Sequence, residues 1–193
     1  MSSESSRPIG VERRQALVRC AYQELAERGF EGLRTREVAA AAGVNIATLH
    51  YYFPTKQALI GSVLAHAMEK FRSTLSASGS PADQLRGHFS GLRALAAEEP
   101  ALFAVMGELA LRAARDPAIR ELYQQTTDIW RATIRGLLVK GRKDGSLPAG
   151  RDAGPQASLV VAALMGACLI PVGRPDRLRE TVGELELTLG LRR

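Results

Sequence analysis

Apolar residues recur every three or four positions along most of the chain, which is the spacing of one face of an α-helix. The first such stripe consists of Leu17, Val18, Ala21, Tyr22 and Leu25. We expect Gly29 to end this helix in the left-handed conformation of a C-cap, with Phe30 folding back over the last turn. The ten residues before the helix are polar and rich in serine, and they are expected to form a mobile arm.

Two short helices should follow the first one. Thr35 is placed to N-cap a helix that runs to about Ala42, and Gly43 then supplies a tight turn. Asn45 is placed to cap a third helix, which Pro54 ends because its ring clashes with further helical backbone. Three helices are thus predicted before residue 55.

The remaining chain predicts longer helices, separated by two breaks rich in Ser, Gly and Pro. Thr55 can cap the first of these helices, and the breaks fall at residues 76–81 and 144–155. Beyond the first break, helices are expected at residues 83–98, 101–115, 117–143, 156–170 and 176–189. With 46% apolar and only 5% aromatic residues, the composition also favours packed helices, so the predicted fold class is all-α.

Charge and composition fit a DNA partner and argue against a membrane protein or a metal protein. The net charge of +6 suits a polyanionic partner such as DNA, although the basic residues are spread along the chain. No apolar leader segment follows the N-terminus, and the apolar run of residues 159–172 is too short to span a bilayer, so we expect a cytoplasmic protein without a membrane partner. The two cysteines lack metal-ligand spacing, so neither a metal site nor a cofactor is predicted.

The segment TREVAAAAGVNIATLHYYF, residues 35–53, has the layout of a helix-turn-helix. Gly43 forms its corner, and small Ala39 lets two helices approach closely. The other places where helices should touch hold Val38, Ala42, Val44, Leu49 and Tyr52. Taken alone, this segment also fits a plain helical hairpin inside a bundle.

The neighbouring residues distinguish these alternatives. Ala26-Glu27-Arg28-Gly29-Phe30 closes the first helix, and Leu49 to Lys56 (LHYYFPTK) leads into another apolar-striped helix. Over about residues 11–70 this arrangement resembles the TetR family of transcriptional regulators. It departs from the family pattern in the order His50-Tyr51-Tyr52 before Phe53, and in Ile46, where a basic residue is frequent.

The resemblance implies a mobile arm at residues 1–10, a helix-turn-helix DNA-binding domain at 11–55 and a ligand-binding and dimerisation domain at 56–193. It further implies that phosphates are held by Thr35, Tyr51 and Lys56. The side chains implied to face the major groove are Asn45, Ala47, Thr48 and His50. Near the arm, Arg7, Arg13 and Arg14 can reach phosphate or the minor groove, or be solvated.

The C-terminal region offers side chains for a ligand pocket between helices. The candidate ligand-binding residues are Phe103, Met106, Tyr123, Thr127, Trp130 and Met165. Ordinary core packing is the alternative for each, since aromatic residues and Met at helical spacing are common in cores. The indole N–H of Trp130 needs a partner, which a ligand or Thr127 can supply, and His88 is expected to be exposed or hydrogen-bonded.

The helix at residues 156–170 is apolar nearly all round, so one side must meet another surface. By resemblance, that surface is the symmetry mate, with the helices at 156–170 and 176–189 forming a homodimer interface. We therefore predict a ligand-responsive regulator, acting as a repressor, that binds a palindromic DNA operator and is released by a small apolar or amphipathic effector. The alternatives are an activator of the same family and a helical small-molecule-binding protein without DNA regulation. No nucleophile elbow, phosphate-binding Gly loop or carboxylate pair with a nearby His supports an enzyme.

Overall fold

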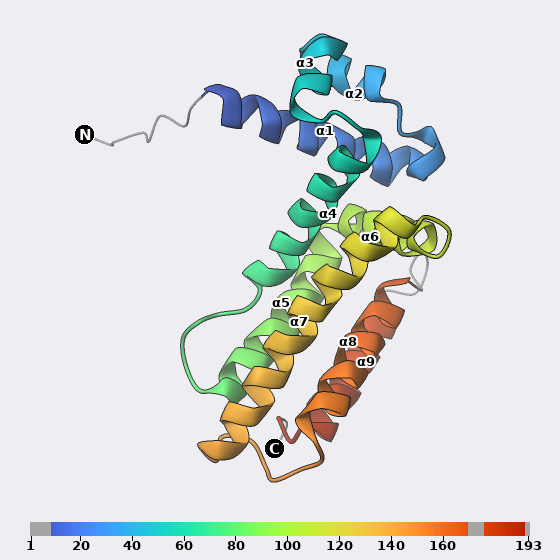
Figure 1. The fold of residues 1–193 in the computed structure, drawn as a ribbon. Coiled ribbons are helices and arrows are strands. Elements are labelled where there is room, and N and C mark those ends of the chain that lie inside the picture. The colour runs from blue at the N-terminus through green and yellow to red at the C-terminus, as the bar shows by residue number, and fades with distance from the viewer. Residues whose placement is uncertain (1–8, 170–175, 192–193) are drawn as a thin grey trace, which may run out of the picture.

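The computed structural model describes residues 9–169 and 176–191, and within these ranges it is built from helices without a strand. The helices are α1 (Ile9–Gly32), α2 (Thr35–Ala41), α3 (Ile46–Tyr52), α4 (Lys56–Ser73), α5 (Pro81–Glu98), α6 (Pro100–Ala113), α7 (Pro117–Lys143), α8 (Ala153–Leu169) and α9 (Asp176–Thr188). The predicted all-α class is confirmed. Figure 1 shows a small head, formed by α1–α3, at one end of an elongated bundle formed by α5–α9.

The head is held together by a small apolar core. Its most buried side chains are Leu17, Leu25, Leu33, Val38, Leu49 and Phe53. Ala39 is also buried, and α2 packs on α3, as expected for a small residue between two closely packed helices. Ala42, Val44 and Tyr52 are half-buried, so they border this core rather than fill it.

Helix α4 connects the head with the bundle. It packs on α1 near the head and on α6 and α7 further along, so one straight element contacts both parts (Figure 1). The hydroxyl of Thr55 accepts a hydrogen bond from the Ala58 N–H at 3.0 Å, which confirms the predicted N-cap. The division between domains at residue 55 stays a prediction, because α4 contributes to both cores.

The bundle surrounds α7, which contacts α4, α5, α6 and α8. Helix α9 covers α8 and α5 at the edge of the bundle. The core includes Leu85, Phe89, Leu102, Met106, Leu109, Ile134, Leu138, Leu164 and Val182. None of the described helices is long and apolar enough to cross a membrane.

Two local predictions for the head differ from the structure. Gly29 has the expected positive φ of 65°, but it bends α1 rather than ending it, and helical turns resume as far as Gly32. Thr35 is the first residue of α2 rather than its N-cap, because Arg34 takes the cap position without a side-chain hydrogen bond. The arm was expected to reach residue 10, whereas α1 already begins at Ile9, and residues 1–8 lie outside the described ranges.

Candidate DNA-binding surface and ligand cavity

The N-terminus of α3 is fixed by a local cap. The Oδ1 atom of Asn45 accepts hydrogen bonds from the backbone N–H of Thr48 at 2.8 Å and from its hydroxyl at 3.0 Å. The predicted N-cap is therefore confirmed, and it satisfies an N–H group that the helix leaves free. These two predicted groove residues thus orient each other as well as α3.

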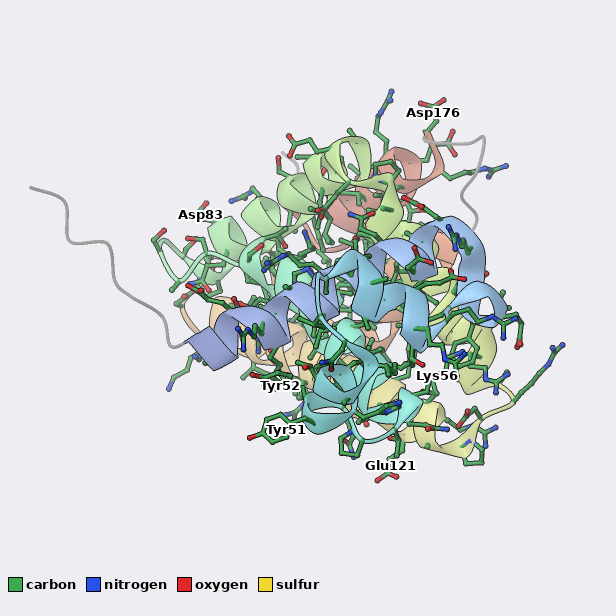
Figure 2. The ribbon with its side chains drawn as sticks, turned by 90° about the horizontal axis from the view of Figure 1, so that it is seen from above. Tyr51, Tyr52, Lys56, Asp83, Glu121 and Asp176 are labelled. Carbon is green, nitrogen blue, oxygen red and sulfur yellow. The ribbon has the colours of Figure 1, made fainter. Side chains whose placement is uncertain are left out.

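The exposed side of α3 carries the other predicted groove residues. Ala47 and His50 are exposed, and Tyr51 is 80% exposed, an unusual degree for an aromatic side chain. In Figure 2, which views the molecule from the end that carries the head, Tyr51 points away from the ribbon. Tyr52 packs edge-on against it, with ring centroids 5.1 Å apart. This helix therefore presents hydroxyl, imidazole and methyl groups outward, the types of group that contact phosphates and base edges.

Basic side chains around the helix-turn-helix have different environments. Arg34 and Arg36 are exposed on either side of the half-buried Thr35. They were missed from the sequence, although two basic residues flanking a predicted phosphate contact were a readable signal. Arg14 donates to the Ser62 hydroxyl at 2.8 Å and lies 5.0 Å from the centre of the Phe53 ring, so it fastens α1 to α4. Arg13 is exposed, and Arg7 lies outside the described residues.

Lys56, a predicted phosphate contact, faces the end of α1. Its Nζ donates to the carbonyl oxygen of Phe30 at 3.2 Å and lies 4.6 Å from the centre of that ring. Partial burial lowers the pKa of Lys56, because desolvation disfavours the charged ammonium. The phosphate contact stays a prediction, and the structure adds a contact between α4 and α1 that spacing did not reveal.

The residue that Lys56 contacts is also held by α6. The backbone N–H of Phe30 donates to Oε2 of Glu108 at 2.9 Å, and the Arg112 guanidinium lies 4.3 Å from the centre of the ring. Arg112 also forms an ion pair with Glu31 at 3.3 Å. We call the set Phe30, Lys56, Glu108 and Arg112 the Phe30 junction. It joins the end of α1, the start of α4 and α6, and it was not predicted.

Gly29 makes this approach possible. A Cβ atom at Gly29 would lie 3.1 Å from Oε2 of Glu108, and the positive φ of this residue strains any other side chain. The predicted left-handed glycine is thus needed both for the bend in α1 and for the close contact with α6.

The partner of the Trp130 indole is His88, rather than Thr127. Trp130 Nε1 donates to His88 Nε2 at 3.0 Å, whereas the Thr127 hydroxyl bonds carbonyl groups of its own helix. Because tryptophan can only donate, Nε2 must accept, and the proton of the imidazole is on Nδ1. That proton is donated to the hydroxyl of Thr74 at 2.6 Å.

His88 is fully buried, as well as hydrogen-bonded. Burial lowers its pKa to about 4, since the charged imidazolium is poorly solvated there. The Thr74 hydroxyl passes its own proton to the carbonyl oxygen of Phe71 at 2.6 Å. A neutral hydrogen-bonded chain therefore links α7, α5 and the C-terminus of α4.

A cavity of about 290 Å³ lies between α4 and α7. It is lined by Gly61, Leu64, Ala65, Met68, Phe71, Arg72, Leu75, Leu122, Gln125, Thr126, Ile129, Trp130 and Thr133. Trp130 stacks on Phe71 with ring centroids 5.9 Å apart. The volume is at the lower end of the range typical of small-molecule pockets.

Of the six predicted ligand-binding residues, Trp130 belongs to the lining of this cavity. Phe103 and Met106 are buried in the core, which corresponds to the alternative considered for them. Tyr123, Thr127 and Met165 are partly exposed or half-buried, and the Tyr123 hydroxyl lies 3.8 Å from the sulfur of Met165. A ligand-binding role for these five residues stays a prediction. Within the described residues, no group of three or more His, Cys, Asp or Glu side chains could hold a metal ion.

A helix-turn-helix with an outward-facing second helix, joined to a helical bundle with a cavity, is an arrangement typical of DNA-binding transcription regulators. Two family models match the chain. The first is described as "Bacterial regulatory proteins, tetR family" and matches residues 17–63, and the second, "BetI-type transcriptional repressor, C-terminal", matches residues 81–185. The chain belongs to the TetR family and is a transcriptional regulator rather than an enzyme.

Individual relatives agree with this assignment. The chain is 26% identical over 149 residues to the HTH-type transcriptional regulator EthR of Mycolicibacterium smegmatis, a match that covers 75% of this chain and 67% of EthR. Two further regulators match over only 32% and 35% of their own lengths. These two matches cover 34% and 39% of this chain.

Solved structures show the same fold. A putative TetR-family regulator from Rhodococcus sp. aligns with a TM-score of 0.81 and 24% identity, covering 93% of this chain and 99% of that one. A putative transcriptional regulator from Saccharomonospora viridis, in complex with choline, aligns with a TM-score of 0.76 and 23% identity, covering 92% and 96%. At these identities the likeness concerns the fold alone.

Proposed function

We propose that this regulator is a cytoplasmic, ligand-responsive repressor that binds a palindromic operator as a homodimer and leaves it when a small apolar or amphipathic molecule binds. The outward face of α3 is the observation that carries the proposal. Tyr51 and His50 on this face are exposed although Tyr51 contacts the Tyr52 ring, and contacts with phosphates and bases would explain this exposure. A cavity against the connecting helix, lined mostly by apolar side chains, supports the response to a ligand.

The proposed dimer uses α8 and α9, which lie together along one edge of the bundle (Figure 1). Leu159 and Leu187 are 57% and 55% exposed there, and Ala162 is exposed between them in chain order. Apolar exposure of this kind is typical of a surface that a partner covers. A twofold axis through this surface would present two copies of α3 to inverted half-sites.

The proposed response depends on α4, which forms one wall of the cavity and continues to the head. A ligand that changes the spacing of α4 and α7 would tilt α4 and change the separation of the two α3 helices. The Phe30 junction offers a second connection, because α6 contacts α1 directly through Glu108 and Arg112. Reciprocity requires operator DNA to weaken ligand binding by the same factor, typically about 5- to 150-fold.

The decisive experiment is to sequence the genomic DNA fragments that the purified full chain retains. We expect a small set of fragments that share an inverted repeat, and transcription from a promoter overlapping that repeat should fall when the protein is added. A rise in transcription would favour an activator. Retention without sequence enrichment would contradict the proposal and favour a ligand-binding protein that does not regulate genes.

A further inference from the structure

The cavity between α4 and α7 differs chemically from one end to the other. Both helices run away from the head (Figure 1), so residues later in each helix lie farther from it. At the end near the head, a Cβ atom on Gly61 would lie 3.2 Å from Leu122, so the two helices are close together there. At the far end the lining includes Arg72 and Thr133. The cavity is therefore narrow at the end near the head and carries its charged side chain at the far end, while Gln125 and Thr126 add uncharged polar groups about one turn after Leu122.

Most polar groups of the lining already donate their protons within the protein. The Thr126 hydroxyl donates to the Leu122 carbonyl at 2.5 Å, and the Thr133 hydroxyl donates to the Ile129 carbonyl at 2.9 Å. The indole N–H of Trp130 donates to His88. The two hydroxyls can still accept hydrogen bonds, but none of these three groups has a proton to offer a ligand.

Arg72 is the charged residue of the lining. One of its terminal nitrogens pairs with Glu69 in an exposed contact, and an arginine has five N–H donors, so others remain for a ligand. None of the described residues that line the cavity is acidic. The Glu69 carboxylate, which is outside the lining, already pairs with this charge, and the remaining N–H groups of the guanidinium can form charge-assisted hydrogen bonds with a ligand carboxylate but not with a quaternary ammonium group.

We propose that this cavity binds an amphipathic anion with a single apolar chain, whose carboxylate lies at Arg72 and whose chain runs between Met68 and Ile129 toward Gly61. The inference rests on the proposed function, in which this cavity is the effector site. The proposed ligand is an anion, whereas the ligand of the choline-bound neighbour is a cation. A quaternary ammonium group cannot accept the hydrogen bonds that the guanidinium of Arg72 offers.

The test compares three probes with the same chain length: octanoate, octanol and octyltrimethylammonium. Binding to the full chain is measured by calorimetry and by the fluorescence of Trp130, the single tryptophan. We expect octanoate to bind most tightly and the ammonium compound most weakly. Replacing Arg72→Gln should weaken octanoate binding roughly five- to tenfold and leave octanol binding unchanged.

Two variants separate charge from position. Arg131 is a half-buried arginine that also forms an i,i+3 ion pair, with Asp128, but it is outside the lining. Arg131→Gln should therefore leave octanoate binding unchanged. Ala65→Phe places a ring in the groove from an exposed position, and it should weaken octanoate and octanol binding alike. Octanoate binding that is indifferent to Ala65→Phe, or reduced equally by both arginine variants, would overturn the proposal.

A separate measurement of operator affinity distinguishes this inference from the proposed function. Octanoate that binds as described but leaves operator affinity unchanged supports the anion site and contradicts the ligand-responsive repressor. If octyltrimethylammonium binds as tightly as octanoate or more tightly, the anion site is wrong. If octyltrimethylammonium then also weakens operator binding, the ligand-responsive repressor is still supported.

Discussion

The head and the bundle are both helical, but they are stabilised in different ways. In the head, α2 and α3 have seven residues each, too few to be stable alone, and they depend on caps such as Asn45 and on packing against α1. In the bundle, α7 has 27 residues and its core encloses a hydrogen-bonded histidine. The head can thus display polar groups on α3 because other elements supply its stability.

The orientation of the head depends on contacts with the rest of the molecule. Its few buried residues fix α3 against α1, while the direction of α1 is set by contacts with α4 and α6. At the Phe30 junction, both backbone groups of one residue are bonded, the N–H by Glu108 and the carbonyl by Lys56. In the proposed ligand response, these two bonds connect α6 and α4 directly to the head at the bend of α1.

The largest expected effect concerns the proposed dimer interface on α8 and α9, a type of surface that the head lacks. Gly166→Arg should prevent dimerisation, because it places unpaired charge in the proposed apolar interface, at a cost of about 3 kcal/mol or more than a hundredfold in the dimer constant. A Cβ atom there has no neighbour within 4 Å, so each chain should still fold. Sedimentation at micromolar concentration provides the measurement.

Gly87→Arg is the matched control, because Gly87 is an exposed helical glycine of α5 with equally open surroundings. It should leave the dimer intact. A dimer that survives Gly166→Arg would place the interface elsewhere.

The buried histidine should make the bundle sensitive to acid. His88 stays neutral in the fold until its lowered pKa of about 4, whereas the unfolded chain takes up the proton near 6.5. The stabilising effect is therefore fully present above pH 6.5 and is lost as the pH falls toward 4, by up to about 3 kcal/mol. Urea unfolding followed by Trp130 fluorescence between pH 7 and 4 measures this loss.

Replacing His88→Gln should make the free energy of unfolding less dependent on pH over this range. Burial also lowers the pKa of His66, so His66→Gln is needed as a control and should flatten the dependence less. An unchanged slope in His88→Gln would show that the buried imidazole does not limit stability in acid.

A moderate effect is expected at the Phe30 junction, where the two regions meet. Glu108→Ala removes the acceptor of the Phe30 N–H, and it should weaken operator binding by about 1 kcal/mol, roughly fivefold, because α1 is less firmly oriented. Glu108→Gln keeps an acceptor oxygen and should recover most of the affinity. Operator affinity is measured by fluorescence anisotropy with the inverted repeat recovered in the DNA-retention experiment. Equal losses of affinity in both variants would argue against a role for the hydrogen bond.

The smallest effects are expected on the outer surface of the head. Tyr51→Phe should weaken binding to all DNA sequences by about 0.5–1 kcal/mol without affecting stability, because its hydroxyl is exposed. Lys56→Ala should weaken binding and also lower the free energy of unfolding, since the Phe30 carbonyl loses its donor. Binding titrations at several salt concentrations test both variants. If Lys56→Ala leaves the salt dependence unchanged, this lysine connects α1 and α4 and does not contact phosphate.

The sequence by itself determined the features that depend on neighbours a few positions apart. The caps at Asn45 and Thr55, the positive φ of Gly29 and the helix-turn-helix spacing follow from interactions within one or two turns. Helix ends were less certain, as Thr35 shows, because a residue able to cap competes with the packing of the whole helix.

Only the tertiary structure decided which distant residues meet. Trp130 and His88 are 42 positions apart, and Phe30 and Glu108 are 78 positions apart, so no spacing in the sequence pairs them. The motif around Lys56 likewise predicted a phosphate contact, but it did not indicate that the ammonium group donates to the Phe30 carbonyl. Helical periodicity fixes which side of each helix is apolar, but the positions where two helices cross depend on how all side chains fill the space between them.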